Sequence, residues 1–110
     1  MHQILIIGTG SIGERHIRCF LETGRTKISV CEKDRALLRR IETDYDVSHA
    51  HEDWYDALSG HPKGVVIATP ANLHIPMALE AAESGCHLMI EKPISTGFLD
   101  LEDLQKRLLE

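Results

Sequence analysis

A short apolar run that leads into three closely spaced glycines constrains the fold of this chain more than any other feature. Residues 3–7 are almost entirely apolar, as expected for a strand that is buried on both faces of a parallel sheet. Gly8, Gly10 and Gly13 follow with the spacing G-x-G-x-x-G. Between a strand and a helix, this spacing predicts a loop that binds the diphosphate of a dinucleotide.

Each glycine of this loop has its own expected role. Gly8 allows the tight turn, Gly10 lets the backbone approach the diphosphate, and Gly13 allows the helix to pack closely on the strand. The N–H groups at the start of the helix, together with its dipole, would then hold the anion. The predicted cofactor-binding loop comprises Gly8, Thr9, Gly10, Ser11, Ile12 and Gly13.

Glu32 stands nineteen residues after Gly13 and directly follows a β-branched stretch that predicts a second strand at 27–31. Its carboxylate could accept hydrogen bonds from ribose hydroxyls and would repel a 2′-phosphate, which favours NAD over NADP as the cofactor. Lys33 could instead accept that phosphate, so binding of NADP stays open. A plain glycine-rich turn without a ligand would not explain Glu32.

Strand-like and helix-like segments alternate along the rest of the chain. The further strands are expected at 47–50, 65–68 and 86–90. Asp34, Asp53 and Asn72 are expected to cap the helices between the strands. This alternation implies right-handed crossovers, and it predicts an α/β fold built on a doubly wound parallel sheet of order 3-2-1-4-5.

The length of 110 residues, with 43% hydrophobic and 26% charged positions, fits one domain over residues 1–110 and leaves no room for a second. A last helix is expected at 96–110, whereas this kind of sheet usually continues to a sixth strand. We therefore expect the domain to be truncated before that strand, with the C-terminal substrate domain absent from this chain. The uncovered apolar surface predicts non-native self-association.

Charge and hydropathy exclude several classes of partner. The net charge of −5 gives no reason to expect nucleic acid as a partner, because proteins that bind its phosphates normally carry a basic face. The longest apolar runs are too short to cross a bilayer, and the first residues lack a signal-like charged region. No membrane partner and a cytoplasmic location are the resulting expectations.

The cysteines and histidines do not predict a metal site. Cys19, Cys31 and Cys86 are odd in number, far apart and set in apolar segments, so we expect them to be reduced and buried. His49 and His51 form the closest histidine pair, but no further ligand has recognisable spacing with them.

Two more groups of polar residues follow predicted strands, at the edge where open α/β sheets bind ligands. The first group comprises Ala68, Thr69, Pro70, Asn72 and His74. The second comprises Glu91 and Lys92, which precede Pro93. Taken singly, His74 could be a satisfied histidine in the first turn of a helix, and the charged pair could be merely solvated. Three groups at one edge favour a shared site.

Together these motifs resemble the glucose-fructose oxidoreductase, inositol dehydrogenase and MocA (Gfo/Idh/MocA) family. The pattern G-x-G-x-x-G-x-x-H stands at 8–16, T-P-x-x-x-H at 69–74 and E-K-P at 91–93. The resemblance implies an NAD(P)-binding Rossmann fold within a nicotinamide-dependent oxidoreductase that acts on a sugar, a polyol or a related carbonyl compound. The residues that it implies to line the cofactor site are Thr69, Asn72, His74 and Glu91. Ala71, where relatives often carry a polar residue, is a small departure.

By the same resemblance, Lys92 is the catalytic candidate. Hydride transfer from a carbinol carbon leaves an alkoxide that must lose its proton, and a lysine beside the nicotinamide can act as the acid or base. The resemblance places the small-molecule substrate and further relay residues in the C-terminal domain. A homo-oligomer is also expected.

Two other classes of function stay open at this point. One is a non-catalytic dinucleotide-binding module with a redox-sensing or regulatory role, in which Lys92 would be a surface charge. The other is a flavin or S-adenosyl domain, in which Glu32 would bind the ribose but Lys92 would have no explanation.

Overall fold

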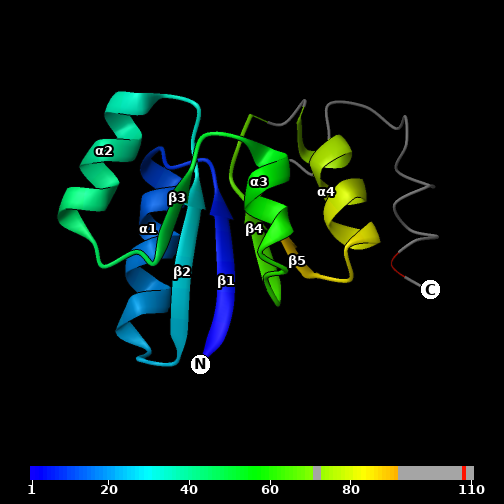
Figure 1. The fold of residues 1–110 in the computed structure, drawn as a ribbon, viewed down its shortest axis with the longest axis horizontal. Helices are drawn as coiled ribbons and strands as arrows, with labels where there is room; N and C mark the ends of the chain where they lie inside the picture. Colours follow the sequence, from blue (N-terminus) through cyan, green and yellow to red (C-terminus); the bar gives the residue numbers. More distant parts are fainter. Residues whose placement is uncertain (71–72, 92–107, 109–110) are drawn as a thin grey trace.

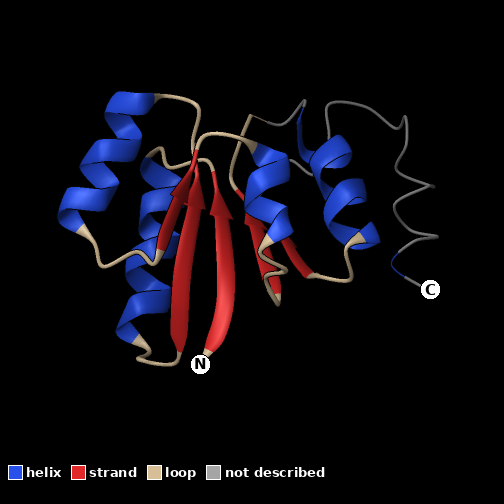
Figure 2. Cartoon of the chain, in the orientation of Figure 1, coloured by secondary structure: helices blue, strands red, loops and turns tan. Residues whose placement is uncertain are grey.

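The computed structural model describes residues 1–70, 73–91 and 108 of the chain. These residues form a parallel sheet with helices on both faces (Figures 1 and 2). The strand order is β3-β2-β1-β4-β5, which confirms the predicted order. Along the chain the elements are β1 (His2–Ile7), α1 (Ser11–Glu22), β2 (Thr26–Cys31), α2 (Arg35–Asp44), β3 (His49–His51), α3 (Trp54–Ser59), β4 (Gly64–Ile67), α4 (His74–Glu83) and β5 (His87–Ile90).

The central strands end in register at one edge of the sheet. In β1, Ile7 pairs with Cys31 of β2 on one side and with Ile67 of β4 on the other. Ile67 in turn pairs with Ile90, the last residue of β5. The residues that follow β1, β2, β4 and β5 therefore emerge side by side. This edge carries the described parts of the predicted site.

Each face of the sheet has its own apolar core, because strand side chains alternate between faces. On one face, Ile6 and Val30 pack against Ile17 of α1 and Ile41 of α2. The opposite face has a second cluster, built from β1, β4, α3 and α4. Figure 2 shows the resulting arrangement of helices, sheet and helices. The doubly wound fold class is thus confirmed.

Two of the three predicted helix caps are observed. The Asp34 carboxylate accepts hydrogen bonds from the N–H groups of residues 36 and 37 at 2.9 and 3.3 Å. Asp53 accepts from residues 55 and 56 at 2.7 and 3.2 Å. Asn72 lies outside the described residues, and the residue at the cap position of α4 is Leu73, whose side chain makes no cap there.

The edge strand begins later than predicted, at His49 instead of residue 47. The chain is still turning before that point, since Val47 N donates to the carbonyl of Tyr45 at 3.0 Å. Ser48 then anchors the strand by donating from both N and Oγ to the Ile28 carbonyl, at 2.8 and 3.1 Å. The prediction placed Val47 in the strand because it is apolar, but Val47 lies in the turn before the strand.

The prediction that all three cysteines are buried is wrong for Cys19, which is exposed, and is confirmed for Cys31 and Cys86. Cys19 follows buried Ile17 by two residues on α1, and two residues correspond to more than half a turn of helix. Its side chain therefore leaves the face that packs on the sheet.

The helix predicted at 96–110 lies outside the described residues, except for Leu108, which is helical and exposed. None of the helices in the described part of the chain has the length and apolar character needed to span a membrane.

Candidate dinucleotide-binding site

The glycine loop is held in a conformation that two of its glycines make possible. Gly8 has a φ of +86°, and a Cβ atom there would lie 2.7 Å from the Ala68 carbonyl oxygen. A Cβ at Gly13 would lie 1.8 Å from the Gly8 carbonyl oxygen, so α1 can pack this close to β1 only with glycine at that position. These are the turn and packing roles that the spacing predicts.

Gly10 differs from Gly8 and Gly13 because a Cβ there would have no described atom within 4 Å. It is the residue that precedes α1, and its φ of −67° is accessible to any amino acid. Neither backbone conformation nor packing therefore requires glycine. Its open surface at the positive end of the helix fits the close approach of a diphosphate.

A cleft of about 410 Å³ runs along the carboxyl edge of the sheet beside this loop. It brings together residues that follow β1, β2 and β4, which are far apart in the sequence. Its predicted lining residues are Gly8, Gly10, Glu32, Lys33, Ala68, Thr69 and Pro70. Half of the lining, however, was not predicted and comprises Ile7, Cys31, Leu37, Glu52, Trp54, Leu73 and Met77.

The unpredicted residues make much of the cleft wall apolar. Leu37 of α2, Trp54 of α3 and Met77 of α4 reach it from three different helices. Such a wall suits the flat face of a nucleobase. One sequence signal could have found it, since Trp54 stands three residues after the end of the edge strand, close to the ligand-binding edge of the sheet. The indole Nε1 of Trp54 is buried and has no hydrogen-bond partner among the described residues.

Glu32 is tied to the glycine loop as well as lining the cleft. Its Oε1 atom accepts hydrogen bonds from Thr9 N at 2.8 Å and from Thr9 Oγ1 at 3.0 Å. Its Oε2 atom accepts from Asp34 N at 3.0 Å. The carboxylate is therefore held in one orientation beside the cleft, where it can still accept a hydroxyl group of a ligand.

Cys31 also lines the cleft but is not a nucleophile at neutral pH. Its burial, together with the negative charges of Glu32 and Asp53, raises the pKa of the Cys31 thiol to about 11. Because the thiolate is the reactive form, this cysteine serves as part of the apolar wall.

His74 and Thr69 form a buried unit at the start of α4. His74 is 1% exposed, and its Nε2 lies 2.6 Å from the Thr69 carbonyl oxygen. A carbonyl oxygen can only accept, so Nε2 carries the proton. The Thr69 hydroxyl donates to the sulfur of Met77 at 3.6 Å. His74 thus fixes the loop that lines the cleft rather than lining the cleft itself.

Glu91 is paired with His16, which stands 75 residues earlier on α1. Both side chains are partly buried, and the contact joins the helix that follows the glycine loop to the end of β5. In the sequence, His16 is marked only as the last position of the pattern G-x-G-x-x-G-x-x-H. The structure gives it a partner in another motif. Lys92, the catalytic candidate, lies outside the described residues.

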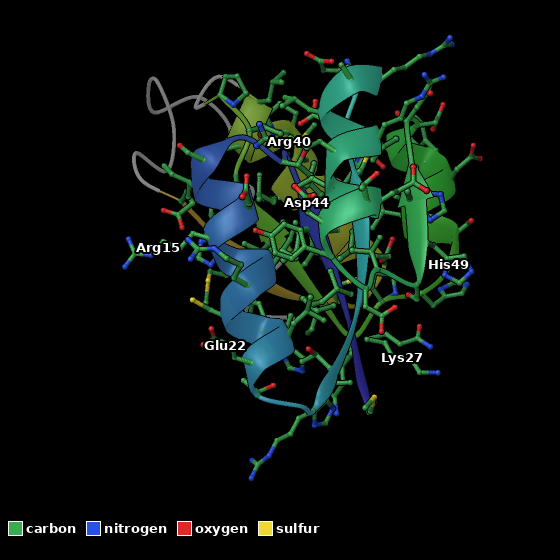
Figure 3. The ribbon with its side chains drawn as sticks, turned by 90° about the vertical axis from the view of Figure 1, so that its left-hand side faces the viewer. Arg15, Glu22, Lys27, Arg40, Asp44 and His49 are labelled. Carbon is green, nitrogen blue, oxygen red and sulfur yellow. The ribbon has the colours of Figure 1, made fainter. Side chains whose placement is uncertain are left out.

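Glu14 places a negative charge in the first turn of α1, close to where a diphosphate would bind. The hydrogen bond from the Tyr45 hydroxyl, at 2.9 Å, and the Arg40 guanidinium hold the pKa of Glu14 below its ordinary value. Arg40 Nη2 donates to this carboxylate at 2.7 Å from between α1 and α2 (Figure 3). Its positive charge offsets a repulsion that would otherwise oppose the anion.

A second hollow, of about 450 Å³, lies on the α3 side of the sheet toward the amino ends of the strands. Lys27 and His49, which Figure 3 labels, belong to its polar lining. None of the predicted site residues lines it. The described residues also contain no group of three or more side chains placed to hold a metal ion. The predicted residues that line a described cavity therefore all belong to the cleft beside the glycine loop.

Residues 2–110 match a protein family described as an oxidoreductase family with an NAD-binding Rossmann fold, which is the Gfo/Idh/MocA family. The chain belongs to this family. The resemblance drawn from the three motifs is thereby confirmed, and so are the Rossmann fold and the assignment to an NAD-binding oxidoreductase domain.

Individual Gfo/Idh/MocA relatives include dehydrogenases. The 4-carboxy-2-hydroxymuconate-6-semialdehyde dehydrogenase of a Sphingobium species is 24% identical over 107 residues, which are 96% of this chain and 34% of that protein. The scyllo-inositol 2-dehydrogenase (NAD(+)) of Bacillus subtilis is 27% identical over 107 residues, 93% of this chain and 30% of that protein.

A solved structure shows the same fold at similar identity. The WlbA dehydrogenase from Bordetella pertussis, in complex with NADH and UDP-GlcNAcA, superimposes with a TM-score of 0.88 at 28% identity, covering 96% of this chain and 32% of that one. The present chain thus spans about a third of the length of the relatives it matches.

Proposed function

We propose that this chain binds NAD in the cleft beside the glycine loop, as the cofactor domain of a dehydrogenase that moves hydride between NAD and a sugar, polyol or related compound. The observation that carries the proposal is the position of Glu32. Its carboxylate lies fixed at the cleft, 3.0 Å or less from the loop atoms that hold it. A ribose diol fits that site, and a 2′-phosphate does not.

The parts of NAD can be assigned to parts of the cleft. The diphosphate would lie against Gly10 and the N-terminus of α1, and the adenosine ribose against Glu32. The adenine would pack on the apolar wall that includes Leu37 and Trp54. The nicotinamide half would then occupy the part of the cleft next to Thr69, on the side toward the end of β5.

We further propose that Lys92 handles the proton in the intact enzyme. When the carbinol C–H bond breaks, the hydride passes to the nicotinamide carbon and the hydroxyl proton must pass to a base. Lys92 follows directly on Glu91, which His16 holds at this edge. Asn72 is proposed to contribute to the same end of the cofactor site. The substrate itself would bind residues beyond the present chain.

Two observations favour an enzyme over a regulatory dinucleotide sensor. The chain retains Lys92 in an E-K-P sequence, which binding alone would not require. The relatives named above are dehydrogenases.

We also propose that the chain self-associates through the surface formed by β4 and β5, where Met89 is 48% exposed.

The cofactor proposal can be tested by titrating the chain with NADH and with NADPH. Trp54 is the chain's only tryptophan and lines the cleft, so its fluorescence reports binding directly. We expect NADH to bind about tenfold or more tightly than NADPH. The negative charge of Glu32 beside the 2′-phosphate should cost about 1–2 kcal/mol of binding free energy. Glu32→Ala should weaken NADH binding and narrow this difference.

A matched control is Glu42→Gln, which removes one negative charge from an exposed position on α2 outside the cleft. It should leave the ratio of the two affinities unchanged. Equal affinities of the unmodified chain for NADH and NADPH would contradict the cofactor choice. Tighter binding of FAD or S-adenosylmethionine in the same assay would contradict the class of cofactor.

A further inference from the structure

Thr9 belongs to the glycine-rich loop and is, with His74, one of the two buried polar residues in the described part of the chain. It is polar and its exposed fraction is 0%. Its N–H and its hydroxyl both donate to the same oxygen of Glu32, 23 residues away, at 2.8 and 3.0 Å. A buried hydroxyl aimed at a carboxylate that lines the ligand cleft requires an explanation beyond the turn itself.

The described donors to Glu32 are not equivalent in what they require of the sequence. The N–H groups of Thr9 and Asp34 belong to the backbone, and almost any residue would supply them. The Thr9 hydroxyl is the donor that depends on a side chain. It therefore distinguishes this loop from one with an apolar residue at the same position.

We propose that Thr9 is a specificity-determining residue that acts by positioning Glu32. The inference rests on the proposed function, in which a dinucleotide occupies the cleft. With the hydroxyl in place, the negative charge of Glu32 stays where it accepts a ribose hydroxyl and repels a 2′-phosphate. Without it, Glu32 would be freer to rotate away, and exposed Lys33, which also lines the cleft, would remain to bind that phosphate.

The test compares Thr9→Val, which keeps the shape of the side chain but removes the donor, with Thr9→Ser, which keeps the donor. NADH and NADPH affinities are measured for each by Trp54 fluorescence. Thr9→Val should weaken NADH binding about threefold to tenfold and shrink the NADH preference by a similar factor, as expected for one hydrogen bond to a charged group. Thr9→Ser should retain the preference within about twofold.

Thr26→Val is the matched control, because the Thr26 hydroxyl also donates within the fold, to the Phe20 carbonyl at 3.0 Å, but does not line the cleft. It can lower stability but should leave the affinity ratio unchanged. In a Glu32→Gln background, Thr9→Val should no longer change that ratio, because the charge that Thr9 positions is gone.

An unchanged ratio in Thr9→Val would overturn the inference, and so would tighter NADH binding, since the hydroxyl would then compete with the ribose. If Thr9→Val does not fold, Thr9→Cys, a weak donor, replaces it with the same expected result. Failure of the unmodified chain to bind NADH would refute the proposed function instead, and this arm separates the two failures.

Discussion

Two glutamates directly follow strands that lie on opposite sides of β1, and their carboxylates are held in different ways. Glu32 follows β2 and is bound by Thr9 of the glycine loop, whereas Glu91 follows β5 and is bound by His16 of α1. Both partners belong to the same short segment of the chain, residues 8–16. That segment therefore links the two ends of the sheet edge at which the cofactor is proposed to lie.

The difference between the two pairs lies in their dependence on the backbone. Two of the described donors to Glu32 are main-chain N–H groups, which need no particular side chain, and the Thr9 hydroxyl is the third. Glu91 is bound by an imidazole, and this contact forms only when α1 packs across toward β5. Main-chain donors and one hydroxyl thus hold the Glu32 carboxylate, whereas the described contact of the Glu91 carboxylate depends on a side chain alone.

The largest effect is expected from the glycines that define the Glu32 end. Gly13→Ala would place a Cβ 1.8 Å from the Gly8 carbonyl oxygen, and we expect a loss of about 3 kcal/mol in the free energy of unfolding, as for severe overpacking. Gly10→Ala meets no described atom and should preserve stability, yet it should weaken NADH binding. Urea denaturation and NADH titration measure the two quantities.

The opposite outcomes would contradict the roles given to Gly10 and Gly13. If Gly10→Ala bound NADH as the unmodified chain does, the diphosphate would not lie against this residue. If Gly13→Ala were as stable as the unmodified chain, close packing of α1 on β1 would not be what this glycine serves.

A smaller effect is expected at the Glu91 end. Glu91→Gln and His16→Gln should each lower the free energy of unfolding by about 1 kcal/mol or less, because the pair is partly exposed to solvent. A double-mutant cycle should give a coupling between them. Neither change should alter the ratio of NADH to NADPH affinities, in contrast to Thr9→Val. A clear change in that ratio would show that the two ends are not independent.

At neutral pH the smallest effect concerns the two buried thiols, Cys31 directly before Glu32 and Cys86 directly before β5. In the folded chain, burial and then the charges of Glu32 and Asp53 raise the pKa of Cys31 from 9.0 to about 11, and burial alone raises the pKa of Cys86. A raised pKa means that the folded state holds the proton more tightly. The resulting stability is present below pH 9 and is lost as the pH rises through 11.

Cys31→Ala should therefore reduce the fall in unfolding free energy between pH 9 and 11, measured by denaturant titration at a series of pH values. Cys86→Ala should reduce it less. Cys19→Ala, at an exposed position, provides the control and should follow the unmodified chain. Equal slopes for Cys31→Ala and Cys19→Ala would contradict the role of Cys31 burial.

Much of the fold could be predicted because its signals are local. The apolar runs of β1 and β4, the caps at Asp34 and Asp53, and the glycine spacing each depend on a few neighbouring residues and on backbone geometry. Strand order then follows from the handedness of the crossovers. The start of β3 was misplaced because an apolar residue, Val47, occupies a turn.

The site was predictable only in part, because the strands that form one edge are fixed by topology but the side chains around it are not. Thr69 and Pro70 follow a strand and line the cleft as expected. His74 follows the same strand but is buried beneath Thr69. Leu37 and Met77 line the cleft because of the rotation of their helices against the sheet, which no short pattern reveals.

By itself, the sequence determined that this chain forms a parallel α/β sheet with a dinucleotide loop, because glycine spacing and apolar periodicity act through the backbone over a few residues. Only the tertiary structure decided that Thr9 holds Glu32, that His16 holds Glu91, and that Cys19 faces solvent. Those outcomes depend on the register of strands and the rotation of helices, which are set when segments up to 75 residues apart pack together.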